Sequence, residues 1–277
     1  MDTNRLWKST YDMLPLRFSS LAASDEGVLF AGTFGHGVFQ FSALHSWECA
    51  SQGLPEDILI YRLDWVDSQL FAATSLGLYR LEDDIWQSTP VRDPCYRTIG
   101  WGDRFVLTAN GLMCGGNGNW IPLAYPGKTT FDLLVTPQFL FLGYEDGIAF
   151  YVLLTGDWCN IPLTQSVTSL AVFNQLLLGT SADGGLVMGN KKGGFHQIRF
   201  EGMFLYRLVS HSGEVYVCAS TGVYKLSALN GRLMLRSMSA QAAVTDLLIW
   251  KDMMLISTLH SGIQYRTTHR SGFQSYL

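Results

Sequence analysis

Three pairs of a tyrosine directly followed by an arginine are the clearest chemical signal in the chain. They are Tyr61-Arg62, Tyr96-Arg97 and Tyr206-Arg207. A guanidinium presents a planar fork of donors that suits a carboxylate or a phosphate, and a neighbouring phenol adds a stacking surface and a hydroxyl. Three such pairs gathered in one place would bind a small anion or an acidic side chain of a protein partner.

Two aspartates, Asp132 and Asp246, stand at the arginine position in other segments of the chain. An arginine beside an aspartate forms an ion pair that satisfies both charges where they are buried. Arg97 with Asp132, and Arg207 with Asp246, are therefore equally well explained as structural salt bridges. Arg62 has no acidic counterpart at this position, which makes it the best candidate for an arginine that faces a ligand.

Two histidines, His36 and His260, offer a second kind of chemistry, because imidazoles bind metals and transfer protons. Both lie in turns that we expect on one face of the protein. No third ligand is evident near them, and turn residues are usually solvated. We therefore predict no metal site and no cofactor.

These residues must be positioned by elements that repeat along the chain. Val28–Phe41 contains two apolar runs joined by a turn rich in Thr and Gly, which is typical of a β-hairpin. Copies of this hairpin begin at Leu29, Leu70, Phe105, Leu140, Leu176, Val215 and Met254. The steps between copies run from 35 to 41 residues, a period that indicates a repeat architecture.

Each hairpin is preceded by one strand-like run and followed by a shorter one, which gives four strands per repeat, named A, B, C and D. Seven such units predict an all-β, seven-bladed β-propeller of antiparallel four-stranded blades, with residues 1–277 as a single domain. A solenoid would need polar caps at both ends, and the sequence shows none.

The Tyr-Arg pairs fall near the start of the A strands, which are innermost in a propeller blade. One position there forms a ring around the central channel, occupied in turn by Ser20, Arg62, Arg97, Asp132, Ser169, Arg207 and Asp246. We expect this ring near the mouth of the channel, on the face shared by the D–A loops and the B–C turns.

The two ends of the chain bear on how the ring closes. Arg5–Thr10 resembles the D-strand segment Ile85–Thr89, which predicts an N-terminal outer strand that completes the seventh blade. The tail offers an alternative, because Gly272–Gln274 resembles the D-strand segment Gly194–Gln197.

The hairpin Leu29–Thr33, the following Trp47 and the turn Gly53–Pro55 together resemble repeats of the propeller superfamily that contains BNR/sialidase-like and WD/YVTN-type proteins. Vps10-type and photosystem II assembly factor propellers belong to this group. The resemblance spans nearly the whole chain and implies the propeller fold. The Asp-box is absent from the C–D turns, the Gly-His and Trp-Asp dipeptides of WD repeats are missing, and the sialidase catalytic residues have no counterpart. The resemblance therefore implies no catalytic residue.

Composition excludes several classes of protein. A hydrophobic content of 48% is too high for a disordered chain, and a net charge of −4 argues against a nucleic-acid partner. No apolar run approaches the roughly 18 residues of a membrane span. The five cysteines show no metal-binding spacing, and we expect reduced thiols in a cytoplasmic protein.

The sequence favours a non-catalytic interaction platform or assembly factor that binds a protein partner on the Arg/Tyr-rich funnel face. One alternative is a small-molecule enzyme, a lyase, isomerase or cyclase, that uses the central funnel for an anionic substrate. A third possibility is a lectin with equivalent shallow sites between the blades. A platform predicts an exposed apolar patch beside the ring, whereas an enzyme predicts a closed pocket with Arg62, Tyr61 or His260 at its floor.

Overall fold

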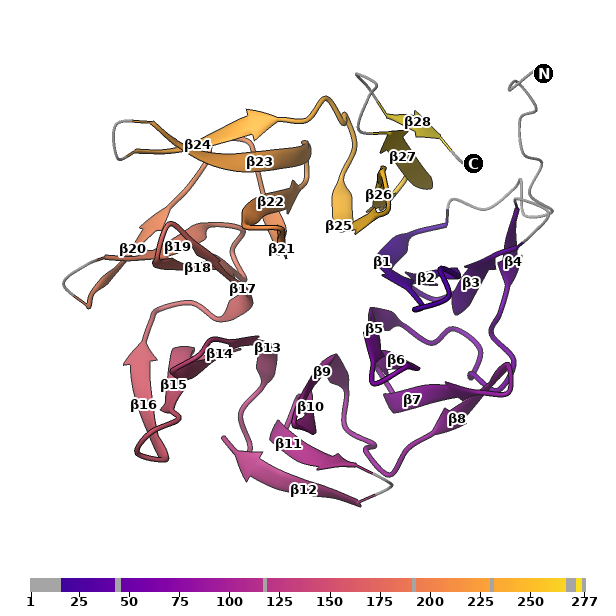
Figure 1. Ribbon diagram of the computed structural model, residues 1–277, viewed down its shortest axis with the longest axis horizontal. Coiled ribbons are helices and arrows are strands. Elements are labelled where there is room, and N and C mark those ends of the chain that lie inside the picture. Colours follow the sequence, from indigo (N-terminus) through magenta and orange to yellow (C-terminus); the bar gives the residue numbers. More distant parts are fainter. Residues whose placement is uncertain are drawn as a thin grey trace.

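The computed structural model describes residues 16–42, 46–116, 119–190, 193–229, 232–267 and 273–275. Within these ranges the chain forms seven antiparallel sheets of four strands each. The sheets stand side by side around a common axis, with the first strand of each sheet innermost (Figure 1). The predicted all-β, seven-bladed propeller is confirmed. The described part of the chain contains no helix with the length and apolar character needed to cross a membrane.

The strands follow one another in chain order within every blade. Blade one comprises β1 (Phe18–Ala23), β2 (Leu29–Thr33), β3 (Val38–Phe41) and β4 (Trp47–Cys49). Blade two comprises β5 (Ile60–Val66), β6 (Gln69–Thr74), β7 (Gly77–Glu82) and β8 (Ile85–Ser88). Blade three comprises β9 (Cys95–Trp101), β10 (Asp103–Thr108), β11 (Gly111–Gly116) and β12 (Asn119–Ala124). Blade four comprises β13 (Thr130–Val135), β14 (Phe139–Tyr144), β15 (Gly147–Val152) and β16 (Asp157–Pro162).

The last three blades repeat this order. Blade five comprises β17 (Val167–Phe173), β18 (Leu176–Ser181), β19 (Leu186–Gly189) and β20 (Phe195–Ile198). Blade six comprises β21 (Leu205–His211), β22 (Glu214–Ala219), β23 (Gly222–Leu229) and β24 (Arg232–Ser237). Blade seven comprises β25 (Val244–Trp250), β26 (Met253–Thr258), β27 (Ile263–Thr267) and β28 (Gln274–Ser275).

The outer place in blade seven belongs to β28, which pairs with β27. This corrects the expectation that an N-terminal strand completes the blade, and the tail alternative holds instead. The proposed N-terminal strand, Arg5–Thr10, lies outside the described residues. The ring closes by packing of whole blades, because one apolar cluster joins Leu21 and Phe39 of blade one to Leu255 and Ile263 of blade seven.

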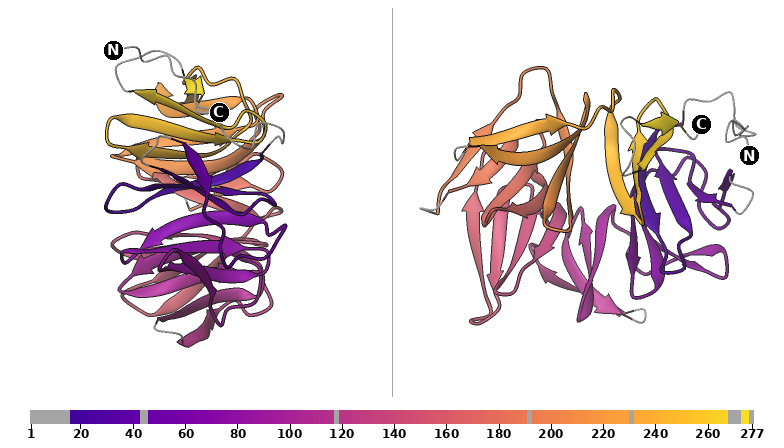
Figure 2. Two further views of the ribbon diagram at one scale, coloured as in Figure 1. Left: turned by 90° about the vertical axis from the view of Figure 1, so that its right-hand side faces the viewer. Right: turned by 45° about the horizontal axis from the view of Figure 1, so that its top comes forward.

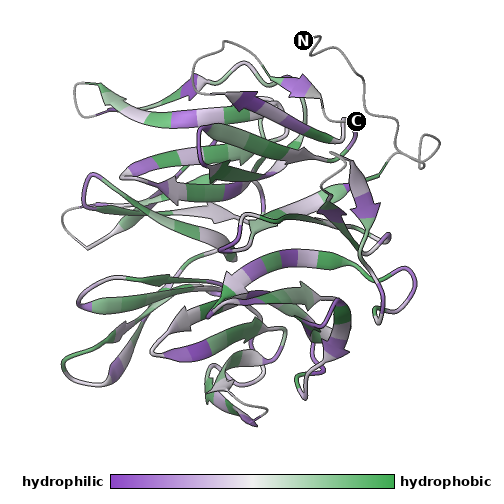
Figure 3. Cartoon of the chain, turned by 45° about the vertical axis from the view of Figure 1, so that its right-hand side comes forward, coloured by the Kyte–Doolittle hydropathy of each residue, from purple (hydrophilic) through white to green (hydrophobic). Residues whose placement is uncertain are grey.

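The blades pack face to face and bury their apolar residues between them. Phe30 and Val38 of blade one, for example, pack in one cluster with Leu63, Ala72 and Trp86 of blade two. Hydrophobic and hydrophilic stretches alternate along the strands, as expected where sheets stack on one another (Figure 3). In the side view the strands run roughly along the axis, and their turns gather on the two sides of the ring (Figure 2, left). The strands therefore hold their turns on two opposite faces.

The Thr and Gly of the repeat build the B–C turns. In blade two the hydroxyl of Thr74 donates to the carbonyl of Gly77 at 2.7 Å and accepts from the amide of Leu76 at 3.1 Å. Gly77 has a φ of +118°, and a Cβ there would lie 2.4 Å from the carbonyl oxygen of Val91, so only glycine fits. The recurring residues of the hairpin are thus part of the scaffold.

We expect Thr74→Val to destabilise the protein by about 1–2 kcal/mol, because the buried Gly77 carbonyl loses its donor and the Leu76 amide loses its acceptor. Urea unfolding followed by tryptophan fluorescence measures the change. Thr155→Val, at an exposed turn of blade four, is the matched control and should leave the free energy of unfolding unchanged. Equal effects of the two variants would show that the Thr–Gly turn is not a stabilising element.

Candidate functional site

The D–A loops and B–C turns lie on one face because backbone hydrogen bonds join them in every blade. In blade two, for example, the amide of Ser75 donates to the carbonyl of Leu59. The equivalent bonds in the other blades run to the carbonyls of Arg17, Pro94, Thr129, Ser166, Phe204 and Ala243. The expectation of a shared face is therefore confirmed.

A β-bulge occurs at the same place in the inner strand of all seven blades. The pairing of β5 with β6, for instance, shifts between Ile60 and Arg62, and Tyr61 is the extra residue. The bulged residues of the seven blades are Ser19, Tyr61, Tyr96, Phe131, Thr168, Tyr206 and Thr245. A bulge re-aims side chains, and here it lets two successive residues, such as Tyr61 and Arg62, contribute to the region around the axis.

The bulged aromatic residues form an arc across three blades. The Tyr61 and Tyr96 rings stack with centroids 5.3 Å apart, and Tyr96 packs on Phe131 at 5.0 Å. Across the channel, Tyr206 packs on Phe204 at 5.2 Å. Partial burial raises the pKa of Tyr96, and the neighbouring Tyr61 adds to this shift. The Tyr96 phenol therefore stays protonated at neutral pH, and the arc presents apolar ring faces with hydroxyl edges.

The residues after the bulges, together with Asp64, bring three arginines and three aspartates close to one another in the channel. Each arginine pairs with one aspartate: Arg62 with Asp64, Arg97 with Asp132, and Arg207 with Asp246. The Arg62–Asp64 and Arg207–Asp246 distances are 3.1 and 2.7 Å. The inter-blade salt bridges proposed for Arg97 and Arg207 are confirmed, and the six charges cancel.

Arg62 is not the unpaired arginine that the sequence suggested, because its Nε donates to Asp64 of the same strand. Asp64 does not occupy the ring position; it lies two residues after Arg62 in β5. Alternate residues of a strand face the same side, so this spacing was the signal that could have revealed the pair.

Each aspartate also accepts a backbone amide from another blade. Asp64 accepts from Thr98 at 2.8 Å, Asp132 from Leu170 at 2.7 Å, and Asp246 from Leu21 at 3.0 Å. In two further blades a serine hydroxyl is the acceptor: Ser20 accepts from the amide of Leu63, and Ser169 accepts from the amide of Leu208. The ring residues therefore link neighbouring blades as well as balance charge.

Burial and pairing act in opposite directions on these groups. Burial raises the pKa of Asp246, but Arg207, Arg62 and the Leu21 amide outweigh it and lower the pKa overall. Burial, followed by repulsion from Arg62, lowers the pKa of Arg97 to about 9, so this guanidinium is still charged at neutral pH. The Nε of Arg97 is buried and has no hydrogen-bond partner among the described residues.

A cavity of about 340 Å³ runs along the channel from this charge cluster toward the A–B turns. Arg62, Asp64, Arg97 and Asp246 line its polar part, and Leu134, Val209 and Leu248 are among its apolar lining. Arg207 crosses the channel, since its guanidinium approaches the carbonyl of Tyr61 at 3.5 Å. Tyr61 and His260 do not line the cavity.

The two histidines lie away from this cluster. His36 and His260 are exposed on their turns, and no hydrogen bond or ion pair joins them within the described ranges. No group of three His, Cys, Asp or Glu among the described residues could hold a metal ion.

Sequence reasoning missed several exposed apolar residues on the same face. Leu59, Leu76 and Phe204 are 37%, 50% and 40% exposed, and they belong to the D–A loops and B–C turns of blades two and six. We call the combined surface the rim patch; it comprises Leu59, Tyr61, Leu76, Tyr96, Phe131, Phe204 and Tyr206. The proximity of Arg207 to Tyr61 shows that its two halves face each other across the channel.

Comparison with known proteins supports the fold. No protein-family model and no curated protein matches the chain. Among solved structures, the extracellular domain of BT4673 from B. thetaiotaomicron superposes with a TM-score of 0.73 at 16% identity; the match covers 90% of this chain but only 38% of that one. Virginiamycin B lyase from Staphylococcus aureus has a TM-score of 0.70 at 10% identity, with 90% and 94% covered. The WD40 propeller domain of Doa1 has a TM-score of 0.67 at 11% identity, with 92% and 94% covered.

At these identities the comparisons show only that the chain has the propeller fold, which WD40 domains also have. The more particular resemblance to BNR/sialidase-like and Vps10-type propellers stays a prediction.

We expect Asp246→Asn to destabilise the protein by about 3 kcal/mol, because it leaves the Arg207 guanidinium buried without a counter-charge. Glu214→Gln is the control, since the Lys225–Glu214 pair is exposed and should contribute less than about 1 kcal/mol. Urea unfolding measures both. A loss for Asp246→Asn no larger than for the control would refute a structural role for the channel ion pair.

The lowered pKa of Asp246 also predicts acid sensitivity. The folded pKa is below the unfolded value of about 3.9, so the stabilisation is complete above that value and is lost as pH falls through the folded pKa. The free energy of unfolding should therefore drop more steeply below about pH 4 in the wild type than in Asp246→Asn. Parallel curves for the two proteins would contradict the assignment.

Proposed function

We propose that this protein is an interaction platform that binds a protein partner through the rim patch. The observation that carries the proposal is the exposure of Leu59, Leu76 and Phe204 beside the stacked aromatic residues at the channel mouth. Aromatic and aliphatic anchors surrounded by polar groups are typical of the centre of a protein interface. A propeller of this fold that is part of the Mitotic Checkpoint Complex provides the precedent for a propeller in a protein assembly.

The alternatives are less well supported. An enzyme that uses the funnel was expected to expose Arg62, Tyr61 or His260 at a pocket floor, but Arg62 is ion-paired and the other two lie outside the cavity. A lectin with equivalent sites needs accessible tryptophans on the D strands, whereas Trp47 and Trp86 are 5% and 2% exposed. A small anion in the channel is still a proposal, and the unpartnered Nε of Arg97 is the donor it would use.

A partner that docks on the rim patch need not neutralise the channel charges, because each arginine already has its aspartate. We therefore propose recognition by apolar and aromatic contact, with the phenol hydroxyls adding direction. We also propose a cytoplasmic location, since the five cysteines are all unpaired and Cys95 and Cys218 are buried.

Photo-crosslinking from the rim patch tests the proposal. A photo-reactive residue in place of Leu76 should give a discrete adduct with one protein in cells that naturally express the chain, and the same residue in place of Leu154 should not. Leu154 is the matched control because it is 94% exposed in the C–D turn of blade four.

The charge-bearing variant Leu76→Asp should then weaken recovery of that partner at least about fivefold, as expected for an interface anchor, and Leu154→Asp should not change it. Adducts from both positions, or a partner indifferent to Leu76→Asp, would refute the rim patch as the binding surface.

A further inference from the structure

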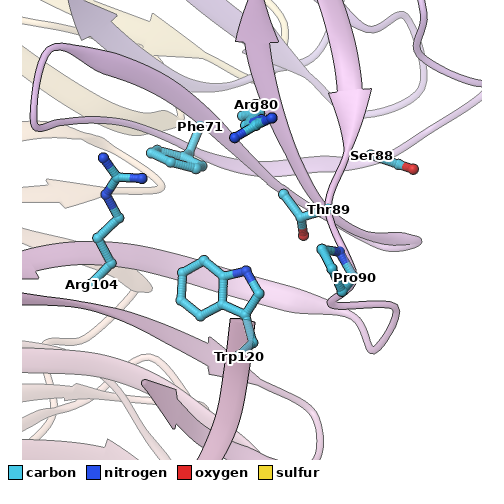
Figure 4. Close-up of a pocket in the computed structure, with 7 residues that line it drawn as sticks. All are labelled: Phe71, Arg80, Ser88, Thr89, Pro90, Arg104 and Trp120. Carbon is cyan, nitrogen blue, oxygen red and sulfur yellow. The ribbon is translucent and has the colours of Figure 1, made fainter. Parts of the chain in front are cut away.

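A second pocket lies between blades two and three, away from the central channel. It has a volume of about 200 Å³. Trp120 of β12 lies on one side, Phe71 and Arg80 of blade two lie on the other, and Arg104 and Thr89 stand at its ends (Figure 4). Trp120 thus differs from the buried tryptophans Trp47 and Trp86 at related positions of the D strands.

The pocket combines flat apolar surfaces with two positive charges. The guanidinium of Arg104 lies over the Phe71 ring, 5.3 Å from its centroid, and this contact fixes its position. Phe71 is 1% exposed, so it forms a rigid base for the arginine. Trp120 and Pro90 add apolar surface to the lining.

Both arginines keep donors available for a ligand. Arg104 uses Nε to reach Asp67 at 2.9 Å, and Arg80 uses one terminal nitrogen to reach Glu82 at 2.9 Å. No other hydrogen bond or ion pair engages either guanidinium in the described ranges of the chain. The side chains of Asp67 and Glu82 are 58% and 40% exposed, and such surface pairs are weak. A guanidinium has five N–H donors, so each can bind an anion without giving up its present partner.

Size and chemistry together define the ligand class. Pockets for drug-sized molecules are roughly 300–1,000 Å³, so this smaller pocket suits a molecule with a single ring. Indole and guanidinium groups both favour flat aromatic partners. We infer that the pocket binds a free aromatic carboxylate with one ring, whose ring packs on Trp120 and whose carboxylate is held by Arg80 and Arg104.

Calorimetric titration with sodium benzoate at low salt tests this inference. We expect saturable binding with a Kd on the order of 1 mM or tighter for so small a ligand. Benzamide has the same ring without the charge and should bind at least about tenfold more weakly, because it lacks the guanidinium contacts.

Variants locate the site. Arg80→Gln and Trp120→Leu should each weaken benzoate binding at least about fivefold. Arg199→Gln removes an exposed arginine of another blade that also pairs with an aspartate, and it should bind benzoate like the wild type. Thermal melts confirm that each variant is folded. Arg80 is partly exposed, so its variant keeps the test valid if Trp120→Leu fails to fold.

Four results would overturn the inference. They are the absence of saturable benzoate binding up to about 20 mM, binding of benzamide as tight as that of benzoate, benzoate binding by Arg80→Gln as tight as by the wild type, and binding of the peptide Gly-Gly-Phe by a protein that does not bind benzoate. The last result would indicate a peptide carboxylate as the ligand. The site is separate from the rim patch, so failure here leaves the proposed function untouched.

Discussion

The inner strand of every blade has one edge without a partner strand, and the backbone amides on that edge need acceptors. A buried amide without an acceptor is costly. Seven equivalent amides follow the ring position, and every one has a side-chain acceptor. Five bond to a side chain of another blade, and those of Leu133 and Leu247 bond to the aspartate that precedes them. This requirement links the blades around the axis and determines which residues the ring can contain.

The requirement also explains why the copies differ. An arginine at the ring position cannot accept an amide, so an aspartate has to be supplied elsewhere. After Arg97 and Arg207 it stands at the ring position of the next blade, and after Arg62 it stands two residues later, as Asp64. Variation that resembled a ligand site is therefore a consequence of capping the inner edge and balancing its charge.

The sequence was sufficient to predict the fold because each repeat carries the Thr and Gly that its turn requires and the apolar residues that its neighbours bury. It was not sufficient to identify the outer strand of blade seven. Outer strands make few contacts, and their short segments resemble one another, so Arg5–Thr10 and Gly272–Gln274 both fitted. The bulges were equally hidden, because no residue type marks them. Comparison of equivalent positions alone also missed Asp64, which acts within one strand.

Some differences between the seven repeats are explained by what the fold requires, and others are not. The ring of arginines, aspartates and serines is accounted for by amide capping, and the Thr and Gly residues by turn geometry. Neither requirement explains the exposed Leu59, Leu76 and Phe204 at the channel mouth, or the two arginines beside Trp120. Exposed apolar residues do not stabilise the isolated fold, and the exposed ion pairs of the two arginines contribute little to it. These residues, rather than the charged channel, are therefore where we propose that the protein binds its partner and its ligand.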